Sequence, residues 1–129
     1  MGRTAFAVIG IFIVIFAAIT FMNRRQDGYE TIAPEEVKGM MKEEAEFVLL
    51  DVRTPEEYRE GHIKGSVLLP LNNLEEEVET EVPDQDTKIV VYCRTGRRSQ
   101  TATNELLKMR YTNLYDLGGI VDWPYDTEQ

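Results

Sequence analysis

The sequence predicts an α/β domain built on a parallel sheet that is covered by helices on both faces. Short apolar runs, typical of strands buried on both sides, alternate along the chain with amphipathic segments of helical period. Several of these runs end in a polar or glycine-containing turn that opens the next helix, as in βα units. At 129 residues the chain has room for one such domain.

An uncharged apolar segment precedes this domain. Residues 4–22 contain no charged side chain, and as a helix they would extend about 28 Å at about 1.5 Å per residue, which matches the hydrocarbon core of a bilayer. The segment lacks a small-residue cleavage site, which favours a single-pass transmembrane helix over a removed signal peptide. We therefore expect a membrane anchor at residues 1–23, a juxtamembrane linker at residues 24–28 and the folded domain at residues 29–129.

Charge and cysteine content favour a domain on the cytoplasmic side of the cell membrane. Arg24 and Arg25 follow the apolar segment, against Arg3 and the terminal amine before it. Cys93 is the only cysteine, so no intrachain disulfide can form, and a reactive thiol is best maintained where cellular thiols keep it reduced. All acidic residues follow Asn23 and the formal net charge is −9, which argues against nucleic-acid binding. With one cysteine and one histidine, no metal site is expected.

The first half of the domain predicts strands and helices in turn. An extended lead-in at residues 31–33 precedes a helix opened by Pro34. The continuous apolar run at residues 47–50 predicts a buried strand. Residues 54–57, Thr-Pro-Glu-Glu, have the composition of a capping box and begin a helix that Gly61 ends.

The second half continues the alternation. Further strands are expected over residues 67–69, 88–92 and 114–117, with helices over residues 71–78 and 98–109. The tail after Trp123 is predicted to be disordered.

The loop after residues 88–92 has the composition of an anion-binding site. It consists of Cys93, Arg94, Thr95, Gly96, Arg97, Arg98 and Ser99. Ligands bind at such junctions between a buried strand and a helix N-terminus in open α/β sheets. Successive backbone N–H groups, the helix dipole and three arginines would stabilise a thiolate, a persulfide anion and an anionic donor, and the hydroxyls of Thr95 and Ser99 are candidates for bonding the sulfur. The alternative is a buried, inert cysteine beside a basic loop.

Three segments, in the right order, resemble the signatures of the rhodanese family. Residues 51–66 resemble its first signature, residues 93–99 its active-site loop and residues 117–123 its C-terminal signature. The resemblance implies a five-stranded parallel sheet and a single-domain thiosulfate sulfurtransferase that uses no cofactor. In that activity Cys93 takes sulfur from an anionic small-molecule donor as a persulfide and yields it to cyanide, a small thiol or a protein thiol.

Two residues outside the loop are candidates for supporting it. Asp51 would stand at the carboxyl end of a strand, as Cys93 does, and Arg53 would orient it; the alternative is that the two residues only organise the turn into the next helix. His62 is expected to be a packing residue, because a cysteine activated by N–H groups needs no base.

Loop length separates sulfur transfer from related chemistries. The related phosphatases and arsenate reductases carry a loop one residue longer between the nucleophilic cysteine and the arginine that clamps a tetrahedral oxyanion. The shorter spacing from Cys93 to Arg98 therefore favours a cradle for one sulfur atom. A membrane-tethered persulfide carrier dedicated to a protein partner is the main alternative function, and a phosphatase-like or arsenate reductase-like activity is less favoured.

Overall fold

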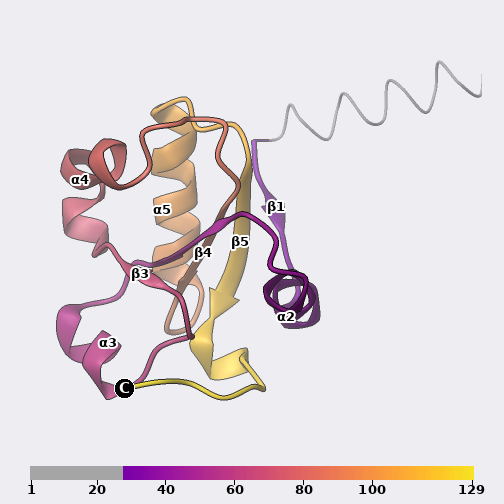
Figure 1. Cartoon of the computed structure of the whole chain (residues 1–129). Helices are drawn as coiled ribbons and strands as arrows, with labels where there is room; N and C mark the ends of the chain where they lie inside the picture. The colour runs from indigo at the N-terminus through magenta and orange to yellow at the C-terminus, as the bar shows by residue number, and fades with distance from the viewer. Residues whose placement is uncertain (1–27) are drawn as a thin grey trace, which may run out of the picture.

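The computed structural model describes residues 28–129 (Figure 1). The predicted anchor at residues 1–23 and most of the predicted linker lie outside the described residues. Over residues 28–129 no helix combines the length and the apolar character needed to cross a bilayer.

A single five-stranded sheet forms the centre of the domain, with all neighbouring strands parallel. The strand order is β1-β5-β4-β2-β3. The strands are β1 (Glu30–Thr31), β2 (Val48–Asp51), β3 (Val67–Leu68), β4 (Ile89–Cys93) and β5 (Leu114–Gly119). The predicted parallel α/β architecture is confirmed, and β4 is its middle strand.

Helices cover both faces of this sheet. They are α2 (Pro34–Lys42), α3 (Pro55–Glu60), the 3₁₀ turn η1 (Leu71–Asn73), α4 (Leu74–Glu81), α5 (Arg97–Lys108) and the 3₁₀ turn η2 (Ile120–Asp122). Helix α2 lies on one side of the sheet, and α4 and α5 lie on the other (Figure 1). The predicted capping box at the start of α3 is present, because the Thr54 hydroxyl accepts from the Glu57 N–H and the Glu57 carboxylate accepts from the Thr54 N–H.

The side chains of β4 alternate between two apolar cores. All five residues of the strand are buried, as expected for a parallel strand covered on both faces. The core on the α5 side includes Ile89, Val91 and Cys93, together with Leu74, Val78, Ala102 and Leu106. The core on the α2 side includes Val90 and Tyr92, together with Val37, Leu49, Ile63 and Trp123. The sulfur-bearing side chain of β4 therefore lies on the side that α4 and α5 cover.

The tail after Trp123 is ordered against α3, so the predicted disorder is wrong. Glu128 and His62 exchange two backbone hydrogen bonds of 2.8 Å as an isolated antiparallel bridge. The Trp123 ring, 8% exposed, closes the α2-side core. The two backbone hydrogen bonds and the burial of the Trp123 ring thus offset the conformational entropy that this terminal segment loses when it becomes ordered.

Replacing Tyr92 with phenylalanine is expected to lower the free energy of unfolding by about 1–3 kcal/mol. The buried Tyr92 hydroxyl accepts from the Ile63 N–H at 3.1 Å and donates to Ser66 Oγ at 3.0 Å, and both partners would be left unsatisfied. Burial raises the pKa of Tyr92, so the hydroxyl keeps its proton. Urea denaturation measures the loss. A matched Tyr115→Phe change should be nearly neutral, because that hydroxyl makes no hydrogen bond within residues 28–129; equal losses would contradict the prediction.

Candidate active site

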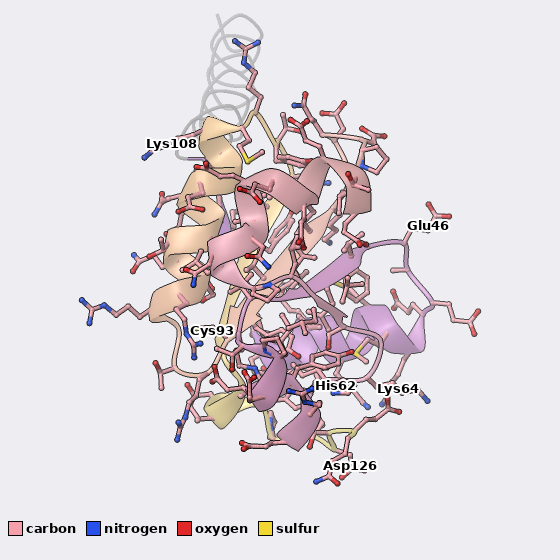
Figure 2. All side chains as sticks on the ribbon, turned by 90° about the vertical axis from the view of Figure 1, so that its left-hand side faces the viewer. Glu46, His62, Lys64, Cys93, Lys108 and Asp126 are labelled. Carbon is pink, nitrogen blue, oxygen red and sulfur yellow. The ribbon has the colours of Figure 1, made fainter. Side chains whose placement is uncertain are left out.

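Cys93 is the last residue of β4, and α5 begins four positions later. The side chain is fully buried, and the Gly96 N–H donates to the Cys93 sulfur at an N···S distance of 3.0 Å. Gly96 has φ 107°, a left-handed conformation that favours glycine, and it caps α5. Figure 2 shows Cys93 beside the N-terminal end of this helix. The loop therefore places one sulfur atom where a backbone donor and a positive helix end meet.

The two hydroxyls expected near the sulfur are used differently. Ser99 is buried, but its Oγ donates to the Gly96 carbonyl oxygen at 3.0 Å, which fixes the first turn of α5. Thr95 is exposed and makes no side-chain hydrogen bond within the described part of the chain. Ser99 therefore shapes the loop without bonding the sulfur.

The three arginines of the loop divide into two groups. Arg94 and Arg97 are exposed and form no ion pair with any residue that the structure describes. Arg98 is half-buried and makes a bidentate pair with Glu57, with Nη1–Oε1 and Nη2–Oε2 distances of 2.6 and 2.9 Å. Two guanidinium groups at the loop are thus available to an anion, while the third is already neutralised.

Glu57 is a residue near the loop that sequence reasoning missed. Its position predicted only the capping box of α3, and Arg98 lies 41 positions further along the chain. The hydrogen bond from Arg98 is the main cause that lowers the pKa of Glu57 to about 2. Because this pKa is lowered on folding, the stabilisation is fully present above the ordinary pKa of 4.5 and is lost as the pH falls toward 2.

Asp51 and Arg53 bond to each other, and neither side chain forms a hydrogen bond or an ion pair with residues 93–99. The buried Asp51 carboxylate accepts from the Arg53 backbone N–H at 3.0 Å and from its guanidinium at distances down to 2.7 Å. Arg53 Nη2 also donates to the Gly61 carbonyl oxygen at 2.6 Å. These contacts fasten both ends of α3 to the end of β2, which is the geometry of the turn-organising alternative.

The end of β5 packs directly against the backbone of residues 94 and 95 in the loop. A one-residue irregularity opposite Val91 and Tyr92 brings Gly119 into register with Cys93. A Cβ atom at Gly119 would overlap the Arg94 carbonyl oxygen and lie 2.7 Å from the Thr95 Cα. The loop backbone thus occupies the space that any other side chain at this position would need.

His62 packs against α3 and forms no hydrogen bond with residues 93–99. Its Nδ1 lies 2.8 Å from the Tyr58 carbonyl oxygen, and its ring stacks on the Tyr58 ring at a centroid distance of 3.7 Å. The imidazole is therefore a packing group.

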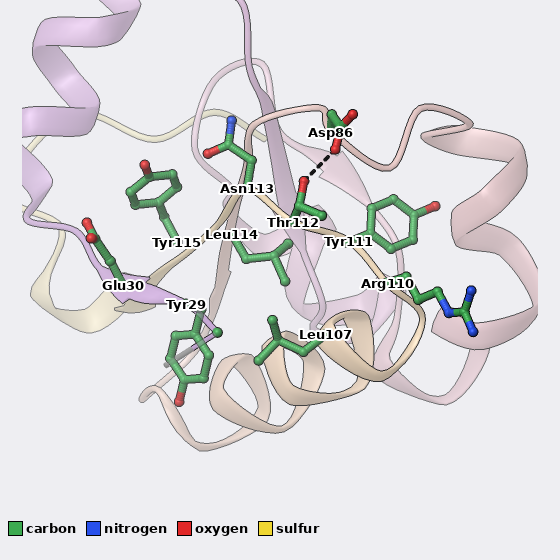
Figure 3. A pocket seen from close by; sticks show the side chains of 11 residues that line it. Tyr29, Glu30, Asp86, Leu107, Arg110, Tyr111, Thr112, Asn113, Leu114 and Tyr115 are labelled. Atoms are coloured by element: carbon green, nitrogen blue, oxygen red, sulfur yellow. Dashed lines mark hydrogen bonds between the residues drawn. The ribbon is translucent and has the colours of Figure 1, made fainter. Parts of the chain in front are cut away.

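A large hollow lies at the other end of the sheet, where the strands begin. Its volume is about 1000 Å³. The lining comprises Gly28, Tyr29, Glu30, Asp86, Leu107, Arg110, Tyr111, Thr112, Asn113, Leu114 and Tyr115 (Figure 3). Thr112 Oγ1 donates to Asp86 Oδ1 at 2.6 Å across this hollow. It contains no nucleophilic thiol, so we do not assign the chemistry to it.

The fold and the loop define a class of α/β proteins with a cysteine at the carboxyl end of a central parallel strand, opening an arginine-rich loop that leads into a helix. The family model described as Rhodanese-like domain matches residues 33–125. The chain belongs to the rhodanese family of sulfurtransferases.

Individual relatives agree with this assignment. Thiosulfate sulfurtransferase PspE of Escherichia coli is 40% identical over 73 residues, which are 57% of this chain and 70% of that protein. A sulfurtransferase of Allochromatium vinosum is 32% identical over 93 residues, 71% of this chain and 85% of that protein. A solved structure described as rhodanese with anions from E. coli superposes with a TM-score of 0.61 at 35% identity, and the match covers 64% of this chain and 96% of that one.

Proposed function

We propose that this protein is a thiosulfate sulfurtransferase that carries sulfur on Cys93. The Cys93 thiolate attacks the outer sulfur of thiosulfate, the S–S bond of the donor breaks, and its electron pair leaves with sulfite. Cys93 is then a persulfide. Cyanide or a thiolate attacks the outer sulfur, which leaves as thiocyanate or as a new persulfide, and the Cys93 thiolate is regenerated.

The observation that carries this proposal is the 3.0 Å contact from the Gly96 N–H to the Cys93 sulfur at the start of α5. A backbone donor and a helix N-terminus favour negative charge on that sulfur both before and after transfer. The exposed Arg94 and Arg97 favour an anionic donor. A similar solved structure is described as containing anions, and a similar protein is named for thiosulfate.

The acceptor must be external, because Cys93 is the only cysteine in the chain and no second thiol can resolve its persulfide. Cyanide, a small thiol and the thiol of a protein partner all fit this requirement. A protein that uses cyanide or a small thiol should turn over rapidly with these acceptors, whereas one that serves a protein partner should not. A kinetic experiment can therefore distinguish the two.

The proposal is tested by incubating the protein with thiosulfate, measuring its intact mass, and then adding cyanide. We expect the mass of one sulfur atom to be gained and then lost as thiocyanate, with repeated turnover. Gain of one sulfur with almost no thiocyanate turnover would instead indicate a carrier dedicated to a protein partner. No gain of sulfur, or rapid hydrolysis of a phosphate ester, would overturn the assignment.

Replacing Arg97 with alanine is expected to raise the KM for thiosulfate roughly three- to tenfold at low ionic strength. Arg97 is the exposed first residue of α5, where a cation opposes the helix dipole, so its loss should not weaken the fold. Lys108→Ala removes the same charge at the opposite end of α5 (Figure 2) and should leave KM unchanged. The two KM values should converge in about 1 M salt, and a persistent difference would contradict an electrostatic role.

We also propose that residues 4–22 anchor the domain to the cell membrane with the catalytic loop on the cytoplasmic side. The support is the uncharged, apolar composition of this segment and the arginines that follow it. The full chain should remain in the membrane pellet after carbonate washing, while a chain starting at residue 24 should be released. Protease accessibility in sealed vesicles reports the side. Recovery of the full chain in the soluble fraction would contradict the proposal.

A further inference from the structure

We propose that Glu57 is a positioning and specificity-determining residue. Its ion pair with Arg98 connects α3 to the sulfur-transfer loop, and it keeps the Arg98 guanidinium from binding the substrate anion. The inference rests on the proposed function and adds to it. It assigns different roles to arginines that the sequence presents as equivalent: Arg98 fixes the loop, whereas Arg94 and Arg97 attract the donor.

The ion pair between Arg98 and Glu57 has the geometry of a specific contact. Both outer guanidinium nitrogens of Arg98 donate, each to a different oxygen of Glu57, at 2.6 and 2.9 Å. The side chains are 34% and 22% exposed, so solvent screens this pair less than an open surface pair. Bidentate charge-assisted bonds fix orientation as well as distance. The pair therefore sets where the Arg98 guanidinium points.

The Glu57 carboxylate is itself held before it meets Arg98. Its Oε1 accepts from the Thr54 N–H and from the Thr54 hydroxyl, both at 3.2 Å, through the capping box of α3. This contact removes much of the rotational freedom that an isolated surface glutamate would lose on forming an ion pair. Glu57 is thus a preorganised acceptor that fastens the second residue of α5 to α3.

Anion selectivity follows from this arrangement. A free guanidinium at the end of the loop would bind the oxygens of phosphate or sulfate through the same two nitrogens that Glu57 occupies. With those donors used and the charge neutralised, inorganic oxyanions gain little from Arg98. The remaining attraction comes from Arg94 and Arg97, which form no ion pair among residues 28–129.

The test compares Glu57→Gln with Glu56→Gln in the full chain. Glu56 is the preceding residue of α3, and among residues 28–129 it pairs only with the exposed Arg59 at 3.5 Å, so its loss removes the same charge without touching Arg98. We expect Glu57→Gln to bind inorganic phosphate about tenfold more tightly by titration calorimetry without thiosulfate, because Arg98 is released. Its kcat for sulfur transfer should fall about tenfold, because the loop loses its tie to α3. Equal phosphate affinity in both variants would overturn the proposal.

A second variant decides the question if Glu57→Gln does not fold. Arg98→Gln should lower kcat while leaving the KM for thiosulfate at the wild-type value, unlike Arg97→Ala. A rise in KM as large as that of Arg97→Ala would show that Arg98 binds the donor directly, and it would refute the positioning role. Phosphate titration needs no sulfur transfer, so its result is independent of the thiosulfate mass experiment that tests the proposed function.

Discussion

Replacing Cys93 with serine is expected to abolish sulfur uptake and to lower thiocyanate formation by at least about 10³-fold, to the uncatalysed background. A serine oxygen cannot form a persulfide, and the chain contains no other cysteine that could accept the sulfur. The change should disturb the fold little, because serine is nearly the same size as cysteine and occupies the same fully buried position at the end of β4. Intact-mass analysis after thiosulfate treatment should show no added sulfur.

The folded state of the Cys93→Ser protein provides the control. Its urea midpoint should remain close to wild type, since the change removes no large apolar group from the α5-side core. A variant that is folded and still gains one sulfur atom would show that the chemistry lies elsewhere. That result would leave the fold description intact and remove the function assigned to the loop.

Replacing Gly119 with alanine is expected to lower kcat/KM for sulfur transfer by about 10²-fold. The new Cβ would overlap the Arg94 carbonyl oxygen and crowd the Thr95 Cα, and both are backbone atoms that cannot rotate away. The loop must therefore shift as a unit, which moves the Gly96 N–H relative to the Cys93 sulfur. A misplacement of about 1 Å at a reacting centre is enough for a loss of this size.

Gly39→Ala is the matched control for this change. Gly39 lies within α2, and a Cβ there would meet no atom within 4 Å. Activity should be unchanged, and stability should rise by about 0.5–1 kcal/mol because alanine is the better helix former. Wild-type activity in Gly119→Ala, measured under the same conditions, would show that the end of β5 does not constrain the loop.

Features encoded by neighbouring residues were predicted well from the sequence. The apolar run at residues 88–92 predicted β4, and the structure confirms that Cys93 ends this strand at the start of a helix. The composition of residues 54–57 predicted the α3 capping box for the same reason, since every partner lies within one turn. The parallel sheet followed from the alternation of such local signals.

Features that depend on contacts between distant residues were not predicted. Nothing near Glu57 in the sequence points to Arg98, because the pair forms only when the carboxyl ends of β2 and β4 lie side by side. The bridge between His62 and Glu128 joins residues still further apart in sequence, and the prediction of a disordered tail was therefore wrong. The two loop hydroxyls were placed near the sulfur by composition alone, whereas Ser99 bonds a carbonyl group of its own turn.

The two chain ends of the folded domain lie at opposite ends of the parallel sheet. Gly28 leads into β1 at the end of the sheet where the parallel strands begin, whereas Cys93 lies at the end where they finish. A five-residue strand such as β4 spans about 17 Å at about 3.3 Å per residue. The C-terminus, held through Glu128, emerges beside α3 on the thiol side (Figure 1). A bulky attachment ahead of Gly28 would therefore lie at the end of the sheet opposite Cys93, whereas one fused after Gln129 would lie at the same end as Cys93.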